Sequence, residues 1–328
     1  MSFTTVERPS ARLNRSQLFV PGVRPPLFEK AATSDADVIC LDLEDAVAPA
    51  DKPQARSNVI AALKTVNFGR KSISVRINGL DTHWCYRDVV DIMEQAGERL
   101  DLIMIPKVGV AADVYAIDML ITQIETAIGR KKPVKLEVII ESVLGLNNID
   151  AIAGASKRLE SLHFGSADFA ASARMRTTNI GGSNADYVML TDKDANGHRE
   201  THWADLWHYP ISRMVHAARA HGLRPIDGPF GDYSDADGYN SQARRTAVLG
   251  CEGKWAIHPS QVALANNVYT PPAAEVKRAE EILAAMKDGV TKGMGAVSLN
   301  GRLIDLASIR QAEVIVQQMQ MIREQTGS

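Results

Sequence analysis

Short apolar runs recur about eight times along this 328-residue chain, and longer helical patterns separate them. Several runs are apolar at nearly every position, as in residues 38–41 and 102–105. A strand that is apolar on both faces must be buried on both faces. Strands in parallel sheets are buried in this way, because helices cover both sides of the sheet. The runs therefore predict eight buried strands, at residues 17–20, 38–43, 73–77, 102–105, 136–140, 162–164, 224–226 and 254–257.

The intervals between these runs carry amphipathic helical patterns. The clearest has Val114, Ile117, Ile121, Ile124 and Ile128, whose spacing of 3, 4, 3 and 4 residues places all five on one stripe. Similar patterns cover residues 52–63, 88–95 and 211–220. Eight alternating strand and helix units predict an α/β protein with a closed (β/α)8 TIM barrel, and an open doubly wound sheet is the alternative.

Two segments do not follow the repeat. Residues 170–205 form a long, polar, glycine-containing insertion after the sixth strand. Later, Thr270-Pro271-Pro272 is typical of a helix start, and a glycine-rich stretch at 289–300 leads into a last amphipathic helix. We therefore expect a catalytic barrel domain at 1–270 and a C-terminal helical extension at 271–328, which acts as a lid or as an arm on a neighbouring subunit.

Composition excludes several classes of protein. The formal net charge is -2 and the basic residues are spread out, whereas binding to nucleic acid needs a concentrated basic face. There is no apolar run of about 18 residues and no signal-peptide pattern, so we expect a cytoplasmic protein without a membrane span. The three cysteines, Cys40, Cys85 and Cys251, form no CxxC pair and are expected to be buried thiols.

Acidic residues concentrate where the predicted strands end. Glu44 and Asp45 follow the second strand, Glu141 the fifth, Asp168 the sixth and Asp227 the seventh. In such barrels the reactive groups lie at the C-terminal strand ends, so we expect these acids to share one mouth. Crowded carboxylates repel one another unless a cation, a proton or an arginine lies among them.

Oxygen ligands of this kind suit Mg²⁺, which takes one or two carboxylates and completes its shell with water and substrate. The fifth and sixth strands are neighbours, so Glu141 and Asp168 are the predicted ligands of Mg²⁺, with Mn²⁺ as a substitute; Glu44 and Asp45 are supporting acids. The alternative is that the acids cap the following helices, and it applies most to Asp45 and Asp227.

Basic side chains near the same ends predict anion binding. Arg76 ends the third strand, where its guanidinium can grip a carboxylate or a thioester oxygen. A salt bridge from Arg76 to Glu44 or Asp45 is the structural alternative, and both roles can coexist. Arg24 and Lys30 flank the start of the first predicted helix, where they either hold phosphate groups or form a solvated helix face.

The motifs at these strand ends resemble those of the citrate lyase β-subunit-like family, also called HpcH/HpaI aldolases, and within it the members that cleave malyl-CoA. The resemblance runs from about residue 12 to 321. It rests on FVPG at 19–22, LDLEDAV at 41–47, VRINGLDT at 75–82, IPK at 105–107, IES at 140–142, GSAD at 165–168, RPIDGPFGD at 224–232, GKWAIHP at 253–259 and GRLID at 301–305.

This resemblance implies a TIM barrel with a C-terminal lid, a homo-oligomer (trimer or hexamer), and reversible cleavage of malyl-CoA to acetyl-CoA and glyoxylate, with β-methylmalyl-CoA giving propionyl-CoA. It implies that Glu141 and Asp168 hold Mg²⁺ and that Arg76 contacts the substrate. It also implies that Asp305 of a neighbouring subunit is the acid and base, although a lone Asp before a helix is usually a cap. The residues implied to lie along the CoA thioester are Phe19, Arg24, Lys30, Ile257 and His258.

Three other functions stay open on the same scaffold. Water can attack the thioester, which makes the chain a malyl-CoA thioesterase. The chain can also be a citrate-lyase-type subunit that needs an acyl-carrier partner. In the third, Lys107, at the end of the fourth strand, forms a Schiff base.

Two metal-like patterns are weaker. The string at 192–197 resembles the start of an EF-hand loop, but Trp203 stands where the glutamate belongs. His198, His202 and His208 lack the glutamate of the HExxH motif and are expected on the surface.

Overall fold

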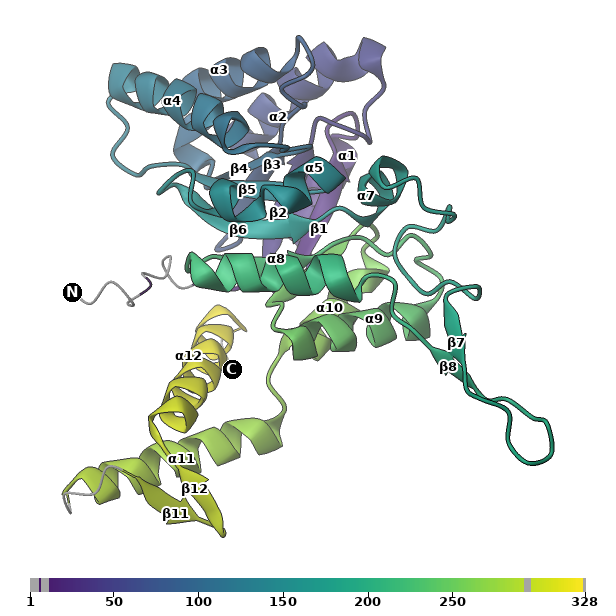
Figure 1. Cartoon of the computed structure of the whole chain (residues 1–328). Helices are drawn as coiled ribbons and strands as arrows, with labels where there is room; N and C mark the ends of the chain where they lie inside the picture. The colour runs from purple at the N-terminus through teal and green to yellow at the C-terminus, as the bar shows by residue number, and fades with distance from the viewer. Residues whose placement is uncertain (1–5, 7–11, 292–295, 327–328) are drawn as a thin grey trace. The chain divides into compact units, whose positions relative to one another are not determined.

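Eight parallel strands close into a barrel in the computed structural model, which describes Val6 and residues 12–291 and 296–326 (Figure 1). Each predicted strand is present, and each begins and ends within three residues of its predicted bounds. The predicted (β/α)8 class is therefore confirmed and the open sheet is excluded. In barrel order the strands are β1 (Ser16–Pro21), β10 (Gly253–Ala256), β9 (Arg224–Asp227), β6 (Leu159–Phe164), β5 (Lys135–Ile140), β4 (Leu102–Ile105), β3 (Ser72–Arg76) and β2 (Val38–Asp42).

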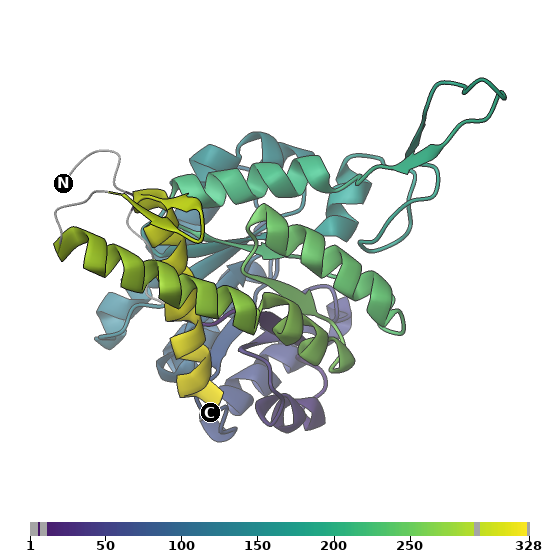
Figure 2. The ribbon, with the colours of Figure 1, turned by 90° about the horizontal axis from the view of Figure 1, so that it is seen from below.

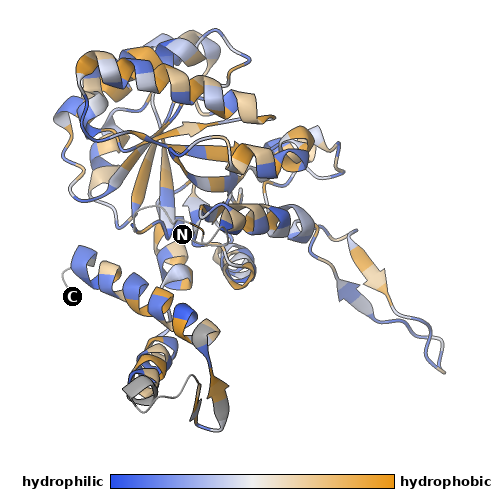
Figure 3. Cartoon of the chain, turned by 60° about the vertical axis from the view of Figure 1, so that its left-hand side comes forward, coloured by the Kyte–Doolittle hydropathy of each residue, from blue (hydrophilic) through white to orange (hydrophobic). Residues whose placement is uncertain are grey.

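Helices follow the strands and bury their apolar stripes. Val114, Ile117, Ile121 and Ile124 of the predicted stripe are buried, whereas Ile128 is exposed where α4 ends. Figure 3 shows the barrel strands coloured largely as hydrophobic, as strands covered on both faces must be. The helices are α1 (Pro26–Ala32), α2 (Lys52–Thr65), α3 (Cys85–Ala96), α4 (Ala111–Ile128), α5 (Val143–Asn147), α6 (Ile149–Ala153), α7 (Ser166–Ser172), α8 (His208–Ala220), α9 (Ala236–Leu249) and α10 (Ser260–Tyr269), with 3-10 turns η1 (Pro49–Asp51) and η2 (Gly97–Arg99).

The insertion after β6 contains a hairpin that projects from the barrel (Figures 1 and 2). It pairs β7 (Val188–Leu190) with β8 (Thr201–Trp203) in antiparallel fashion. The string that resembles an EF-hand forms the tip, where Asp194 Oδ1 accepts the backbone N–H groups of Asn196 and His198 at 2.8 Å each. This carboxylate is therefore engaged in turn formation.

The described residues from 267 onward, with residues 12 and 13, form a second compact unit. It consists of α11 (Ala273–Thr291), a hairpin of β11 (Val297–Leu299) and β12 (Arg302–Ile304), and α12 (Leu306–Thr326). Ala279, Ile282, Met286, Ile304 and Ala312 form its core. Both ends of the glycine-rich stretch carry regular structure, because α11 continues to Thr291 and β11 begins at Val297. No helix in the described part of the chain is long and apolar enough to cross a membrane.

A buried ion pair joins β9 to β10 and corrects one prediction. Lys254 Nζ lies 2.7 Å from Asp227 Oδ2, and neither side chain is exposed. The two residues are paired in register, and Thr246 Oγ1 donates to the same carboxylate oxygen at 3.1 Å. The prediction that Asp227 shares the mouth with the other acids was wrong, because a lysine on the neighbouring strand satisfies its charge inside the protein.

We expect Lys254→Met to lower the free energy of unfolding by about 3–5 kcal/mol, because it leaves Asp227 buried without its counter-charge. Urea denaturation followed by circular dichroism measures the change. The double variant Lys254→Met/Asp227→Leu should recover much of the loss. As a control, Arg213→Gln removes the exposed ion pair with Asp150 and should cost less than about 1 kcal/mol. An equally small effect for Lys254→Met would contradict this account.

Candidate active site

A cavity of about 330 Å³ opens at the C-terminal ends of the barrel strands. All of its lining belongs to the barrel unit. One part of the lining is acidic with a single arginine, and the other part is apolar. The lining residues are Phe19, Pro21, Asp42, Asp45, Ala46, Arg76, Glu141, Gly165, Ala167, Asp168, Ile180, Pro229, Trp255 and Ile257.

Glu141 and Asp168, the predicted metal ligands, both line this cavity. Glu141 directly follows β5 and is 3% exposed, and Asp168 lies half-buried in the first turn of α7. A Cβ atom on Gly165 would overlap the Glu141 side chain, so only glycine lets the end of β6 approach so closely. Lys107 has a left-handed backbone, φ 55°, and its N–H donates to Glu141 Oε1 at 2.6 Å.

The electrostatics of this pair favour a cation. Burial and the neighbouring charge of Asp168 raise the pKa of Glu141 to about 8. Burial and the charge of Asp45 also raise the pKa of Asp168. A divalent cation between two such carboxylates would relieve both effects. Among the described residues no group of three or more His, Cys, Asp or Glu side chains is arranged so that it could hold a metal ion. The donor set therefore fits Mg²⁺, which needs few protein ligands, better than a structural zinc ion.

Arg76 is held as a fixed cation in the same cavity. Its Nε and one terminal nitrogen donate to the two oxygens of Asp42, at 2.7 Å each. The other terminal nitrogen lies 2.9 Å from Glu44 and 3.1 Å from Asp45. Burial alone would lower the pKa of Arg76, but these carboxylates, Asp42 first, hold it well above its usual range. Phe19 packs against the guanidinium, with 5.3 Å between its ring centre and the guanidinium carbon.

Asp42 is the residue that the sequence interpretation missed. The expected ion pairs of Arg76 with Glu44 and Asp45 are present, yet the bidentate partner is Asp42. A signal was available, because Asp42 and Arg76 end neighbouring strands and are paired in register.

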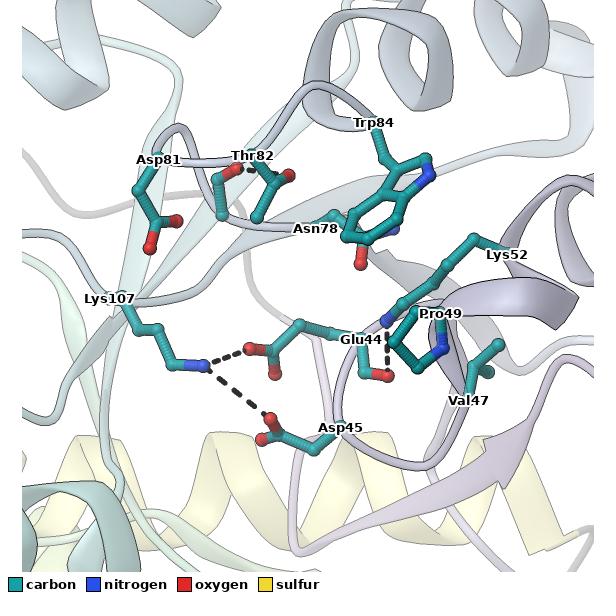
Figure 4. Close-up of a pocket in the computed structure, with 11 residues that line it drawn as sticks. Glu44, Asp45, Val47, Pro49, Lys52, Asn78, Asp81, Thr82, Trp84 and Lys107 are labelled. Atoms are coloured by element: carbon teal, nitrogen blue, oxygen red, sulfur yellow. Dashed lines mark hydrogen bonds and ion pairs between the residues drawn. The ribbon is translucent and has the colours of Figure 1, made fainter.

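A second cavity, of about 270 Å³, is lined by Glu44, Asp45, Lys52 and Lys107 among others, and shares Asp45 with the first cavity (Figure 4). Figure 4 shows Lys107 pointing toward both acids; its Nζ lies 2.6 Å from Glu44 Oε1 and 3.5 Å from Asp45 Oδ1. Burial alone would lower the pKa of Lys107, but the hydrogen bond and charge of Glu44 raise it. A Schiff base needs a neutral amine, so this ion pair opposes that role for Lys107. On the opposite side of Glu44 from Lys107, Lys52 Nζ donates to the backbone oxygens of Leu43 and Glu44.

The residues predicted to lie along the thioester are only partly brought together. Phe19 and Ile257 line the cavity, whereas Arg24, Lys30 and His258 are exposed residues outside its lining. His258 stacks on Tyr233, with 4.7 Å between ring centres. The prediction that Lys30 flanks the start of the first helix was wrong, because Lys30 lies in the last turn of α1.

Asp305 belongs to the second compact unit and is exposed. Its Oδ1 accepts the backbone N–H of Ser308 at 3.0 Å and the Ser308 hydroxyl at 3.1 Å. This is the helix-capping geometry that a lone Asp before a helix predicts. These hydrogen bonds, the backbone one first, lower the pKa of Asp305. The catalytic role of Asp305 stays a prediction.

The fold and its acid-lined mouth place the chain among the enzymes built on a closed (β/α)8 barrel, with the reactive groups at the C-terminal strand ends. Residues 15–259 match the HpcH/HpaI aldolase/citrate lyase family. The chain belongs to this family.

Curated relatives span almost the whole chain. This chain is 58% identical to an L-malyl-CoA/β-methylmalyl-CoA lyase of Cereibacter sphaeroides, and the match covers 98% of this chain and 99% of the relative. It is 57% identical to the protein of the same name from Rhodobacter capsulatus over 98% and 100%. A solved structure, protein CitE of Mycobacterium tuberculosis in complex with magnesium, acetoacetate and coenzyme A, is 27% identical with a TM-score of 0.69, covering 94% of this chain and 98% of that one.

Asp168→Asn and Glu141→Gln should each weaken Mg²⁺ binding by about 100-fold or more, since even outer-shell partners of a metal are worth about 10–100-fold. Titration calorimetry with Mg²⁺, and with Mn²⁺ as a probe, measures the affinity. Glu94→Gln, on the exposed face of α3, is the control and should bind as the wild type does. Unchanged affinity in both cavity variants would exclude this pair as the metal site.

Proposed function

We propose that the chain is a divalent-cation-dependent carbon–carbon lyase that reversibly cleaves L-malyl-CoA to acetyl-CoA and glyoxylate. We propose the same reaction for β-methylmalyl-CoA, which gives propionyl-CoA and glyoxylate. The observation that carries the proposal is the convergence of Glu141, Asp168 and the fixed Arg76 on one cavity. The 58% identity to an L-malyl-CoA/β-methylmalyl-CoA lyase supports the choice of substrate.

The reaction breaks the bond between the hydroxyl-bearing carbon and the carbon next to the thioester. The electron pair of that bond passes to the thioester carbonyl and forms an enolate. The hydroxyl gives its proton to an ionised carboxylate, and the carbon that carried the hydroxyl becomes the aldehyde carbon of glyoxylate. The same carboxylate then delivers one proton to the enolate carbon, so the proton count balances. A cation held by Glu141 and Asp168 would act as a Lewis acid and as a template for the glyoxylate fragment. Mg²⁺ suits the two carboxylates, and Mn²⁺ is the expected substitute.

Arg76 would stabilise the enolate oxygen, where negative charge develops. A donor is most effective when it is already in place before the charge appears. Asp42 fixes one edge of the guanidinium and Phe19 packs against it, so Arg76 needs no rearrangement during the reaction. Glu44 and Asp45 support this position through the remaining terminal nitrogen.

Asp305 of a neighbouring subunit would transfer the proton at the enolate carbon. It would protonate that carbon during cleavage and remove the proton during condensation. The Ser308 hydrogen bonds that lower the pKa of Asp305 keep it ionised, as a base requires. This role needs a homo-oligomer, a trimer or a hexamer, in which the C-terminal unit acts as a lid that excludes water.

The CoA part of the substrate would extend from the cavity over exposed residues. Phe19 and Ile257 line the cavity, where an apolar chain can pack. Arg24 and Lys30 are exposed cations on the segment that follows β1, and they would meet the CoA phosphates. His258 follows Ile257 after β10 and would lie along the same path.

A glyoxylate assay on malyl-CoA, with and without EDTA, tests the function. We expect glyoxylate and acetyl-CoA in equal amounts from the purified chain alone, loss of activity with EDTA, and recovery with excess Mg²⁺. Free CoA thiol without glyoxylate would instead indicate a thioesterase. Activity only on an acyl-carrier substrate would indicate a citrate-lyase-type subunit. Covalent trapping by borohydride plus substrate would indicate a Schiff base on Lys107.

Asp305→Ala should lower kcat by about 10²–10⁴-fold, the usual contribution of a positioned acid or base. Mg²⁺ affinity, measured by calorimetry, should not change, because Asp305 is not one of the proposed ligands. Ser308→Ala is the matched control: it keeps the carboxylate but removes one hydrogen bond to it, so its effect should be far smaller. Near wild-type kcat in Asp305→Ala would remove this residue from the mechanism.

A further inference from the structure

Residues 180–182, part of the insertion after β6, are fastened to the mouth of the barrel. Gly231 N–H donates to the Ile180 carbonyl at 2.8 Å. The N–H of Gly182 donates to Gln242 Oε1 at 2.8 Å, and the indole N–H of Trp207 donates to the Gly182 carbonyl at 2.8 Å. Gln242 and Trp207 are buried, so these contacts hold the segment from within the barrel unit.

The local backbone permits this approach only because glycines occupy the critical places. Gly181 has φ +74°, and a Cβ atom there would lie 2.7 Å from the Pro229 carbonyl oxygen. A Cβ atom on Gly231 would lie 2.9 Å from Ile180 Cβ. A side chain at either position would force a shift, so glycine permits the segment around Ile180 to lie close against the loop that follows β9.

The result is that Ile180 lines the proposed substrate cavity, although the hairpin of the same insertion projects away from the barrel. Ile180, Pro229, Ile257, Phe19 and Trp255 are the larger apolar residues of the lining. Ile257 is held in place by its N–H, which donates to Gln261 Oε1 at 2.8 Å. Ile180 is 39% exposed, so apolar surface remains in the cavity for a substrate to cover.

The chemistry of each part of the substrate indicates which part would contact Ile180. Glyoxylate is a carboxylate with an aldehyde, and it belongs with the cation and with Arg76. The CoA phosphates require cationic or hydrogen-bonding partners. The alkyl substituent on the carbon next to the thioester is apolar and attached to a reacting carbon, so it must fit inside this cavity.

We propose that Ile180 determines which acyl groups the enzyme accepts, by contacting the substituent that distinguishes acetyl from propionyl and longer thioesters. This inference rests on the proposed function and assigns a role to the insertion. A single methylene in an apolar pocket changes kcat/KM by about 10–200-fold, so the size of one side chain is enough to select between these substrates.

The test measures kcat/KM for the condensation of glyoxylate with acetyl-CoA, propionyl-CoA and butyryl-CoA. Ile180→Phe should lower the propionyl-to-acetyl ratio by about 10-fold, and Ile180→Ala should raise the butyryl-to-propionyl ratio by about 10-fold. The ratios are taken within one variant, so a loss of folded protein cancels. Met189→Ala, which shortens an exposed residue of the projecting hairpin outside the cavity lining, is the control and should keep the wild-type ratios.

One result would overturn the inference alone. If the Ile180 variants keep the wild-type ratios, even where all three kcat/KM values change together, Ile180 does not contact the acyl group. If the wild-type chain condenses none of them with glyoxylate, the proposed function fails first and the inference fails with it.

Discussion

Negative charge gathered at one end of a closed barrel is the constraint on which the site depends. Parallel closure brings every C-terminal strand end to the same mouth, and the acids there are compensated unequally. Asp42, Glu44 and Asp45 share Arg76 and Lys107, which lie within ion-pair distance. Glu141 and Asp168 have no ion-pair partner in the described residues. Burial raises the pKa values of both, and it also raises the pKa of Glu44 to about 7 in spite of its two cationic partners, so the missing partners and not the pKa values distinguish the pair. The proposed Mg²⁺ site follows from this imbalance.

Residues of the apolar barrel core pack against side chains of the same site. Trp255 is buried among Cys40, Met104, Ile139 and Ile226, and its indole N–H donates to His163 Nδ1 at 2.8 Å. Phe19 packs on Trp255, with 4.2 Å between ring centres, and also against the guanidinium of Arg76. Packing in the interior therefore positions the proposed electrostatic catalyst, which fits the need for a preorganised donor.

The errors of the sequence interpretation on Asp227 and Asp42 share one cause. Asp227 and Asp168 both follow apolar strands, but only Asp227 has a lysine in register on the next strand, so it is buried as an ion pair. Asp42 was overlooked beside Glu44 and Asp45, although its position in register with Arg76 gives it the bidentate contact. A pattern along the chain locates charged groups at strand ends, but their partners lie on neighbouring strands that are distant in sequence.

Sequence alone determined the alternation of buried strands and amphipathic helices, and with it the barrel and the end at which the acidic residues gather. It also located Glu141, Asp168 and Arg76 at strand ends, because the side-chain period of each element can be counted along the chain. Tertiary structure decided which carboxylates pair and which stay uncompensated. It also brought Ile180 from a polar insertion into the cavity. Both outcomes depend on contacts between residues far apart in sequence, as when Gln242 holds Gly182, and no local pattern specifies such contacts.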